Sequence, residues 1–367
     1  MNILFVTSHL RKGGPVNVIY SLCREFSRLS GTKVVLLTLR KEGAGSKLPD
    51  FKKEGIRVIA LNHSYGQCEL LATMVRKEIQ KVVNELNIDI VHSHGYHAAI
   101  ACCGLKNVKL VATLHDRAKE DFLNVFGPFV GRYMLKRYYL ALRRFDANVA
   151  VSDSTAEAYG GILPHLSYVN NGIDTSLFKP LAPEEREKLR KSLGIPEGAS
   201  VFVSSGRIEK EKRMEELVSW FAGLPSSLNV VLYVLGAGSR LQACRELAEG
   251  HDNIHFTGQL SNVRDYLQAS DFYISYSKSE GMSLAVCEGV ACGLTPVLSN
   301  IPSHHDMVDM VGGFLFDDFK NIDMSKILKN RKSTQLLYEE TSRHFSVQSM
   351  TQGYLKVYNE LIEQTTK

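Results

Sequence analysis

The sequence predicts an α/β protein built on two doubly wound parallel sheets. Short β-branched runs alternate with longer amphipathic segments up to residue 152, and the alternation restarts at residue 200 after a polar stretch. This alternation is typical of βαβ units whose helices cover both faces of a parallel sheet. The 367 residues also suit two domains of roughly 100 to 200 residues each. We therefore expect two such domains facing a central cleft, with ligands at the carboxyl ends of the strands.

The first half supplies six expected strands. Gly13 and Gly14 follow the first of them and precede Pro15, which suits a helix that begins near Val16. Adjacent glycines let the backbone approach a ligand closely, and a simple tight turn is the alternative interpretation. The six runs are residues 3–6, 33–39, 57–61, 89–94, 109–115 and 147–152.

The second half repeats the pattern after a polar stretch that contains Gly172, Pro180 and Pro183. We place the domain boundary near residue 172. The final helical pattern, from Ser346, carries apolar residues at spacings of three and four, which predicts one buried face. The second set of strands is expected at residues 200–206, 229–236, 253–258, 271–277, 295–299 and 312–317.

The composition is that of an ordinary globular protein and excludes several classes. A formal charge of +5 suits anionic ligands or an acidic membrane surface but is too small to indicate nucleic-acid binding. Seven scattered cysteines without a CxxC pair predict neither a disulfide framework nor a zinc site. The sequence shows neither a signal peptide nor an apolar run of roughly 18 residues. We therefore expect a cytoplasmic protein, at most peripheral at the inner face of the membrane.

Two glutamates stand out in the segment SEGMSLAVCEG at residues 279–289. Glu280 follows an expected strand, and Glu288 lies about two turns inside a helix that Gly293 ends. The first N–H groups of this helix would lie at its positive end, where phosphate binds readily. Each carboxylate can accept paired hydroxyl hydrogen bonds, as a sugar or a ribose diol offers them. A solvated loop residue and a helix-surface residue remain the alternative.

A second charged group follows the first strand of the second half, in GRIEKEKR. Arg207 and Lys212 stand five residues apart across a loop. Two cations beside a helix N-terminus match a diphosphate, because they neutralise its charge both when it is bound and when it leaves. The other charged residues of the run are interpreted as solvated surface: Glu209, Lys210, Glu211 and Arg213.

Histidines end two expected strands of the first half. His94 and His115 both fall at the cleft side of the sheet. A metal site formed by His92, His94 and His97 is the alternative, but these side chains lack a clear carboxylate partner. The chain also has no Asp-x-Asp triplet to hold a divalent cation on a diphosphate. We therefore expect no bound metal.

Two further stretches suggest other functions. GAGSRL at residues 236–241 lacks the third glycine of a dinucleotide fingerprint, which argues against NAD binding. The basic, aromatic run RYMLKRYYLALRRF at residues 132–145 is compatible with a membrane-surface helix. An ordinary domain helix whose charged residues reach outwards explains the same run, and we favour that interpretation.

Taken in order, these motifs resemble one known family. They are GGP, DIVHSH, ATLHD, AVSDST, VNNGIDTSLFKP, SSGRIEKEKR, VLGAGS and EGMSLAVCEGVACGLTPVLSNIPSH. Over essentially its whole length the chain resembles the retaining, nucleotide-sugar-dependent glycosyltransferases of family 4, which implies the GT-B fold. The resemblance implies an N-terminal Rossmann-like domain on the acceptor side, a second such domain on the donor side, and a C-terminal helix that crosses back to the first domain. The corresponding ranges are 1–171, 172–345 and 346–367.

The resemblance also implies roles for single residues. Glu288 would bind the ribose hydroxyls, and Glu280 would bind hydroxyls of the transferred sugar. Arg207 and Lys212 would bind the diphosphate, and His115 would lie beside the donor sugar near the reacting carbon. The assisting backbone positions would be Gly14, Gly281, Met282, Ser283 and Leu284.

The implied function is transfer of a sugar from a nucleotide diphosphate sugar, with a UDP-sugar favoured. The acceptor would be a carbohydrate or a lipid-linked glycan, in surface polysaccharide or glycoconjugate synthesis. No cofactor beyond this co-substrate, no metal and no nucleic-acid partner is expected, and a peripheral membrane contact stays open. A nucleotide-sugar epimerase of the same fold and a non-catalytic partner subunit are the alternatives. Gly289 and Asp306 stand where the family usually has alanine and glutamate, and neither departure removes a proposed ligand.

Overall fold

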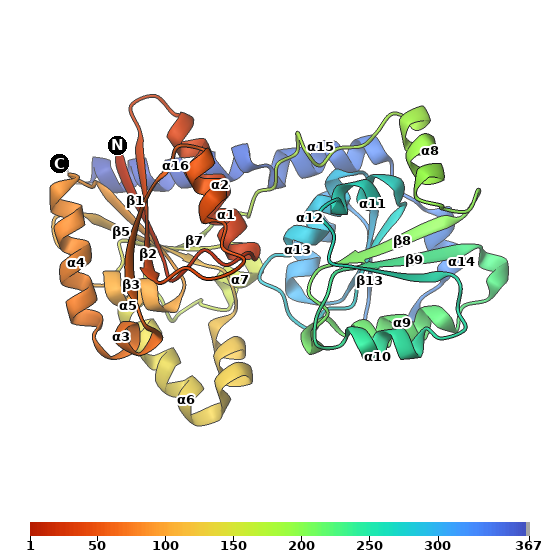
Figure 1. The fold of residues 1–367 in the computed structure, drawn as a ribbon, viewed down its shortest axis with the longest axis horizontal. Coiled ribbons are helices and arrows are strands. Elements are labelled where there is room, and N and C mark those ends of the chain that lie inside the picture. Colours follow the sequence, from red (N-terminus) through yellow and green to blue (C-terminus); the bar gives the residue numbers. More distant parts are fainter. Residues whose placement is uncertain (365–367) are drawn as a thin grey trace. The chain divides into compact units, whose positions relative to one another are not determined.

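The computed structural model describes residues 1–364 and divides into two compact units (Figure 1). Unit 1 contains Met1–Gly172 together with the C-terminal residues from Val347 onward. Unit 2 contains Ile173–Ser346. Each unit is built on one fully parallel sheet, which confirms the predicted fold class.

The sheet of unit 1 has seven strands. They are β1 (Asn2–Thr7), β2 (Lys33–Arg40), β3 (Arg57–His63), β4 (Ile90–His94), β5 (Lys109–Leu114), β6 (Ala147–Ala150) and β7 (Leu166–Tyr168). Their order is β3-β2-β1-β4-β5-β6-β7, so the strand order reverses at β1. The sequence does not predict β7, because three half-exposed residues at a sheet edge carry too short a hydrophobic pattern.

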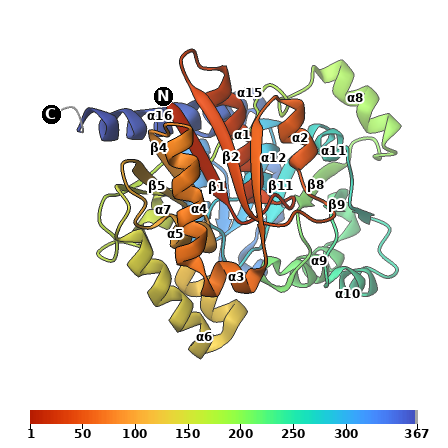
Figure 2. The ribbon, with the colours of Figure 1, turned by 60° about the vertical axis from the view of Figure 1, so that its left-hand side comes forward.

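The helices of unit 1 follow the strands in βαβ order. They are α1 (Gly14–Arg28), α2 (Leu48–Lys53), α3 (Tyr65–Leu70), α4 (Ala72–Glu85), α5 (Tyr96–Cys102), α6 (Ala118–Leu142), α7 (Asp153–Glu157) and α16 (Val347–Glu363). Helix α6 is kinked at Gly127, whose φ of 74° is not helical, and at Pro128. It packs against α5, beside α3 (Figure 2). Arg137 of α6 bonds the carboxylate and the carbonyl of Glu69 in α3.

A buried polar network fastens α16 to this sheet. The hydroxyl of Tyr358 and Nδ1 of His92 are 2.6 Å apart, and Nε2 of His92 lies 2.6 Å from Oγ1 of Thr113. Thr113 in turn lies 2.7 Å from the hydroxyl of Tyr354. These side chains come from α16, β4 and β5, and all four are buried. Since buried polar groups are costly when unpaired, the network fixes how α16 sits on β4 and β5.

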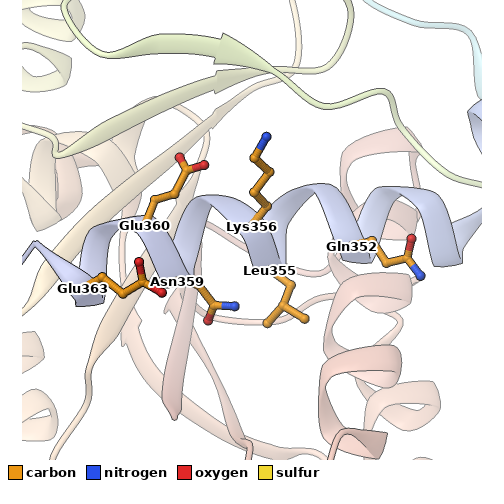
Figure 3. A pocket seen from close by; sticks show the side chains of 6 residues that line it. All are labelled: Gln352, Leu355, Lys356, Asn359, Glu360 and Glu363. Atoms are coloured by element: carbon orange, nitrogen blue, oxygen red, sulfur yellow. The ribbon is translucent and has the colours of Figure 1, made fainter.

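The outer face of α16 carries a shallow hollow of 430 Å³ (Figure 3). Its lining residues all belong to this single helix: Gln352, Leu355, Lys356, Asn359, Glu360 and Glu363. Ligand sites are enclosed and largely apolar. This hollow is lined by one helix only and carries charges of both signs. It is therefore not a candidate substrate-binding site.

The sheet of unit 2 has six strands. They are β8 (Ser200–Ser205), β9 (Val230–Leu235), β10 (Ile254–Gly258), β11 (Phe272–Ser275), β12 (Thr295–Ser299) and β13 (Phe314–Phe316). Their order is β10-β9-β8-β11-β12-β13, so the reversal falls at β8. All six lie within the predicted runs. The central strands carry the hydrophobic residues expected of a parallel sheet that is covered on both faces.

The helices of unit 2 connect these strands. They are α8 (Pro183–Ser192), η1 (Lys210–Lys212), α9 (Met214–Ala222), η2 (Ser226–Leu228), α10 (Leu241–Leu247), α11 (Val263–Ala269), α12 (Leu284–Ala291), α13 (Pro302–Val311), η3 (Phe319–Asn321), α14 (Met324–Lys329) and α15 (Thr334–Phe345). Helix α12 ends where the sequence predicts it, with Gly293 at a φ of 87°.

Asp271 fastens the beginning of β11 to β8. Its carboxylate accepts hydrogen bonds from the backbone N–H of Val201 at 2.9 Å and from Arg186 at 2.7 Å. Arg190 and Arg331 bond the same carboxylate at 3.2 and 2.6 Å. One buried acid therefore ties two central strands, α8 and the loop before α15 together.

Gly289 has a packing reason to be glycine. A Cβ built on it would lie 2.4 Å from Cδ2 of the buried Tyr273 ring. The Tyr273 hydroxyl donates to the carbonyl of Ser205 at 3.0 Å, which holds the ring in place. The resemblance implies an alanine at position 289. In this chain the ring of Tyr273 occupies the space that the methyl group of an alanine would need.

We expect Gly289→Ala to destabilise unit 2 by about 1 to 3 kcal/mol, because overpacking outweighs the gain in helix propensity. Urea unfolding monitored by circular dichroism measures the effect. Gly66→Ala is the matched control, since a Cβ on Gly66 in α3 meets nothing within 4 Å. The control should be neutral or gain up to about 1 kcal/mol. Equal gains in both variants would contradict the packing argument.

Candidate functional site

The reversal of strand order in unit 2 brings two predicted segments together. The loop after β8 carries Arg207 and Lys212, and the loop after β11 carries Glu280. Since β8 pairs with β11 in parallel, both loops leave the same edge of the sheet at adjacent positions. The backbone N–H of Lys278 donates to the carbonyl of Glu211 at 2.8 Å. Ligands of doubly wound sheets bind at such a switch point.

Lys212 and Glu280 form an ion pair in this structure. The side chains retain 24% and 12% of their exposure, so the pair is largely shielded from solvent. The sequence predicts separate ligands for these two residues, a diphosphate and a sugar. The structure shows that they also neutralise each other, which lowers the free-energy cost of holding both charges in a shielded place.

Arg207 stands apart from this pair. Its side chain is 78% exposed, and its contact with Glu211 is a loose one at 3.7 Å. An exposed ion pair of this kind contributes little to stability. The structure therefore places Arg207 in the same loop as Lys212 but not against Lys212 or Glu280.

Glu288 is a half-buried acid whose carboxylate has no ion-pair or hydrogen-bond partner within residues 1–364. It lies in the second turn of α12, and burial raises its pKa to about 7. Among residues 1–364, no side chain or backbone N–H donates to its carboxylate. A shielded acid that is neither paired nor hydrogen-bonded costs stability, which points to a role in binding. The side chain of Glu288 is half-buried, and its carboxylate is not among the fully buried polar groups that lack a partner within residues 1–364.

The backbone before Glu288 suits an anion. Leu284 is the first residue of α12, Ser283 precedes it, and the Ser283 side chain makes no capping bond. The first N–H groups of a helix have no partner within it. No acidic side chain occupies this first turn. The predicted positions Gly281 to Leu284 therefore lie where a helix favours negative charge.

The glycines of GAGSRL have a structural role beside the site. A Cβ on Gly236 would lie 1.9 Å from the carbonyl oxygen of Gly206, and one on Gly238 would lie 2.2 Å from that of Ile208. Only glycine allows the loop after β9 to lie this close to the loop that carries Arg207. The glycines support the neighbouring loop, and the sequence assigns them no ligand.

His304 is a site residue whose role the sequence leaves open. It lies in α13 and is fully buried, and its Nδ1 lies 2.9 Å from the carbonyl oxygen of Ser299. The hydroxyl of Ser299 donates to the carbonyl of Ser277 at 2.7 Å, in the loop that carries Glu280. Its Nε2 has no hydrogen-bond partner within residues 1–364. The HH dipeptide in SNIPSHHD is the only signal in the sequence that marks it.

In unit 1, two predicted residues meet at the ends of β4 and β5. Nδ1 of His94 lies 2.9 Å from Nε2 of His115. Burial lowers the pKa of both side chains, that of His115 to about 4. Gly14 begins α1, after the strand beside β4. The loop before Gly14 is held by Glu42, whose carboxylate accepts a hydrogen bond from the N–H of Leu10 at 3.0 Å.

The three histidines of the metal alternative do not converge. His92 uses both ring nitrogens in the network of α16, and His97 lies in α5 beside Glu69, with His97 Nε2 3.4 Å from a carboxylate oxygen. Over the part of the chain that the structure describes, no three His, Cys, Asp or Glu side chains are placed to hold a metal ion. The same residues contain no helix long and apolar enough to cross a membrane.

Comparisons with known proteins identify the family of the chain. Residues 12–177 match the family model described as Glycosyltransferase Family 4, and residues 185–343 match the model described as Glycosyl transferases group 1. Together the two matches extend over both units.

Relatives and solved structures carry related names. The chain is 22% identical to the O-antigen biosynthesis glycosyltransferase WclY of Escherichia coli over 380 residues, 99% of each protein. It is 26% identical to N-acetyl-alpha-D-glucosaminyl L-malate synthase of Bacillus anthracis over 59% of this chain and 58% of that protein. The Anabaena protein HepE, solved in complex with UDP, has a TM-score of 0.82 at 19% identity, covering 98% of this chain and 100% of that one. The chain therefore belongs to the family 4 glycosyltransferases.

Proposed function

We propose that this glycosyltransferase transfers a sugar, with retention of configuration, from a nucleotide diphosphate sugar to a glycan or lipid-linked glycan. The observation that carries the proposal is Glu288. A carboxylate that is shielded, unpartnered and raised in pKa is suited to accept two hydroxyl hydrogen bonds from a ribose. Such a diol would satisfy its hydrogen-bonding capacity without adding another charge.

The neighbouring groups suit the rest of a donor. The start of α12 and Lys212 offer N–H groups and a positive charge for a diphosphate, and Glu280 offers a carboxylate for sugar hydroxyls. Since Lys212 and Glu280 pair with each other, the donor would have to separate them. Arg207 would have to turn inwards from its exposed position. Donor binding would thus exchange one ion pair for several contacts with the ligand.

The chemistry that we propose leaves the proton transfer to the substrate. In the family, retention is usually ascribed to same-face attack, with the departing phosphate accepting the proton of the acceptor. His115 would then support the donor sugar without serving as the base, in keeping with its lowered pKa. No metal is needed in this scheme, because cationic side chains and a helix terminus take its place at the diphosphate.

UDP is the nucleotide that we favour. Relatives of the fold are named as complexes with UDP and with UDP-glucose, and curated relatives are named for O-antigen biosynthesis. The acceptor would belong to surface polysaccharide or glycoconjugate synthesis. Its choice would rest with three unit 1 segments that the sequence predicts as loops, at residues 42–55, 62–70 and 116–130. The structure instead forms α2, α3 and the first half of α6 within them.

A hollow of 180 Å³ at the beginning of α6 supports the assignment of the last segment. It begins two residues after His115 and combines two cations and one acid with the hydroxyl of Tyr139. The hydroxyl of Tyr159 is already bonded to the backbone of Asp116 and Ala118. Such a surface suits the hydroxyls or a phosphate of an acceptor. Its lining residues are Arg117, Ala118, Lys119, Glu120, Tyr139, Ala158 and Tyr159.

We also propose that unit 1 touches an anionic membrane surface. All basic residues of the run 132–145 except Arg137 are exposed, and Arg137 bonds Glu69. Met134, Tyr138 and Leu142 are buried, so the run is a packed domain helix, as we favoured. The exposed apolar side chains lie around the kink that precedes it, where Phe129 is 86% exposed. Arg132 and Lys136 flank them on the same helix. Apolar tips flanked by cations are typical of interfacial binding.

Nucleotide binding is the first test of the donor assignment. Thermal unfolding of the purified chain is followed with UDP, GDP, ADP, CMP and dTDP, each with and without a chelator. We expect one of them, UDP by preference, to stabilise the chain without metal by about 2.7 kcal/mol at a hundredfold excess over its dissociation constant. Stabilisation by none of them would favour the non-catalytic alternative, and turnover of a nucleotide sugar without an acceptor would favour the epimerase.

Lys212→Ala and Glu288→Gln extend this experiment as variant arms. Each should weaken nucleotide binding tenfold or more, because a charged hydrogen bond in a shielded site contributes about 1.5 to 3 kcal/mol. Lys210→Ala, an exposed lysine in the same short helix, is the matched control and should bind normally. Unchanged affinity in both folded variants would contradict the site.

Glu288 should also cost stability when no ligand is bound. Its pKa is raised above the unfolded value of 4.5, so the free energy of unfolding falls as pH rises from 4.5 to 7, and the cost is fully present above pH 7. We expect Glu288→Gln to be about 1 to 2 kcal/mol more stable than the wild type at pH 8 and nearly equal to it at pH 5. Urea unfolding at both pH values measures this. The exposed Glu249→Gln should show no such difference, and a pH-independent effect of Glu288→Gln would refute the argument.

Vesicle sedimentation tests the membrane contact. The wild type should bind vesicles that contain anionic lipid at low salt and should be released as salt is raised, since screening weakens the attraction. Phe129→Ser combined with Val130→Ser should lower binding about tenfold, given the loss of two apolar side chains. Leu247→Ser, an exposed leucine in unit 2, is the control. Absence of wild-type binding at low salt would exclude the contact.

A further inference from the structure

His94 and His115 form a hydrogen-bonded pair of unequal exposure. His94 is the last residue of β4 and is only 3% exposed, whereas His115 follows β5 and is half-buried. Nδ1 of His94 and Nε2 of His115 are 2.9 Å apart. The other ring nitrogen of His94, Nε2, is buried and has no hydrogen-bond partner among residues 1–364. Within residues 1–364, the hydrogen bond to His115 is therefore the only one that the His94 side chain makes.

The surroundings of His94 keep the pair uncharged. The ring of His92 lies 4.3 Å away on the same strand, and the ring of Phe5 stacks on it from β1 at 5.9 Å. Thr7 of β1 and Thr113 of β5 flank it in the sheet register. None of these groups is an acid, and within residues 1–364 no ion pair joins either histidine to a carboxylate. With neither imidazolium stabilised, each ring carries one proton.

Two arrangements of these protons are possible. If Nδ1–H of His94 donates to Nε2 of His115, the bare Nε2 of His94 is buried and His115 carries its proton on Nδ1. If Nε2–H of His115 donates instead, the Nε2–H of His94 is a buried donor without an acceptor. Buried N–H groups without an acceptor are rarer in proteins than acceptors that lack a donor. The first arrangement is therefore the more stable one.

The backbone on which the pair stands is held firmly. Two residues earlier on β4, His92 uses both of its ring nitrogens, one toward Tyr358 of α16 and one toward Thr113 of β5. Thr113 lies two residues before His115 and is itself bonded to Tyr354. Alternate residues of a strand share one face. The network of α16 thus fixes the two strand ends from which His94 and His115 project.

We propose that His94 is a positioning residue that holds His115 in its Nδ1–H tautomer, so that His115 offers the substrate an N–H donor. The kinetic consequence of this inference rests on the proposed role of His115 at the donor sugar. The tautomer of His115 does not depend on that role. His115 would donate a hydrogen bond to a hydroxyl or phosphoryl oxygen and would keep its proton throughout the reaction. It would then orient the sugar, while the base remains on the substrate.

The tautomer can be observed directly. Long-range proton–nitrogen correlation spectra of the full chain, labelled with 15N-histidine, show which ring nitrogen of each histidine carries the proton; His115→Gln assigns the signal. We expect a protonated Nδ1 and a bare Nε2 for His115 in the wild type. His94→Asn keeps a donor near the position of Nδ1 and should preserve this state. His94→Leu removes the donor and should shift His115 toward Nε2–H, the tautomer that free histidine prefers.

Kinetics test whether His94 acts through His115. We expect His94→Leu to lower kcat/KM for the donor about tenfold, the size of one hydrogen bond, while His94→Asn keeps most of it. In a His115→Ala background, His94→Leu should cost nothing more, because the group that it positions is gone. Nucleotide affinity should be unchanged in every variant, since its proposed ligands lie in unit 2. A general loss of stability would instead lower the activity in both backgrounds.

Each outcome decides a separate point. A protonated Nε2 on His115 in the wild type overturns the inference, and so does an equal kinetic loss in both backgrounds. If His94→Leu does not fold, the wild-type spectrum and the His94→Asn variant still decide the tautomer. If no sugar is transferred to any acceptor, the proposed function fails, while the spectra remain a test of what His94 does to His115.

Discussion

The carboxylate of Asp271 is the interaction on which the arrangement of unit 2 depends. It bonds the N–H of Val201 and three arginines, and so fixes the start of β11 beside β8. Parallel pairing then carries both strands to the same edge of the sheet. Because the strand order reverses at β8, no intervening strand separates the loop of Lys212 from that of Glu280. A buried anchor at one end of two strands thus determines which charges can meet at the other end.

The charges at that edge are stabilised unequally. Lys212 and Glu280 neutralise each other, so that part of the site is stable as it stands. Glu288 has no such partner within residues 1–364, and burial raises its pKa. A protein tolerates the cost of an unpaired acid where a ligand repays it. The unpaired glutamate therefore carries more information about function than the paired one, although the sequence marks both equally.

Much of this arrangement follows from the sequence, for a physical reason. A continuous hydrophobic run predicts a buried parallel strand, and the residues after it must lie at the carboxyl edge. The positions of Glu280, Lys212 and His115 at strand ends follow from this alone.

The sequence does not predict which partner each side chain has. Arg207 and Lys212 occupy one loop, yet one is exposed and the other paired, because a long side chain takes whichever partner the folded loops bring within reach. The strand β7 is missed because three edge residues bury too little to leave a pattern.

The two histidines of β4 share one face of the strand but have different hydrogen-bond partners. In DIVHSH, the spacing of two residues predicts that His92 and His94 lie on one face of a strand. The spacing does not predict that the two side chains have different roles. His92 is satisfied at both nitrogens and serves the packing of α16, whereas His94 is satisfied at one nitrogen only, by His115. A neutral imidazole has one donor and one acceptor, so the unused nitrogen of His94 restricts where its proton can reside. That restriction passes to His115, the half-buried member of the pair. A sheet interior can in this way determine the hydrogen-bonding character of a residue at its edge without any charged group taking part.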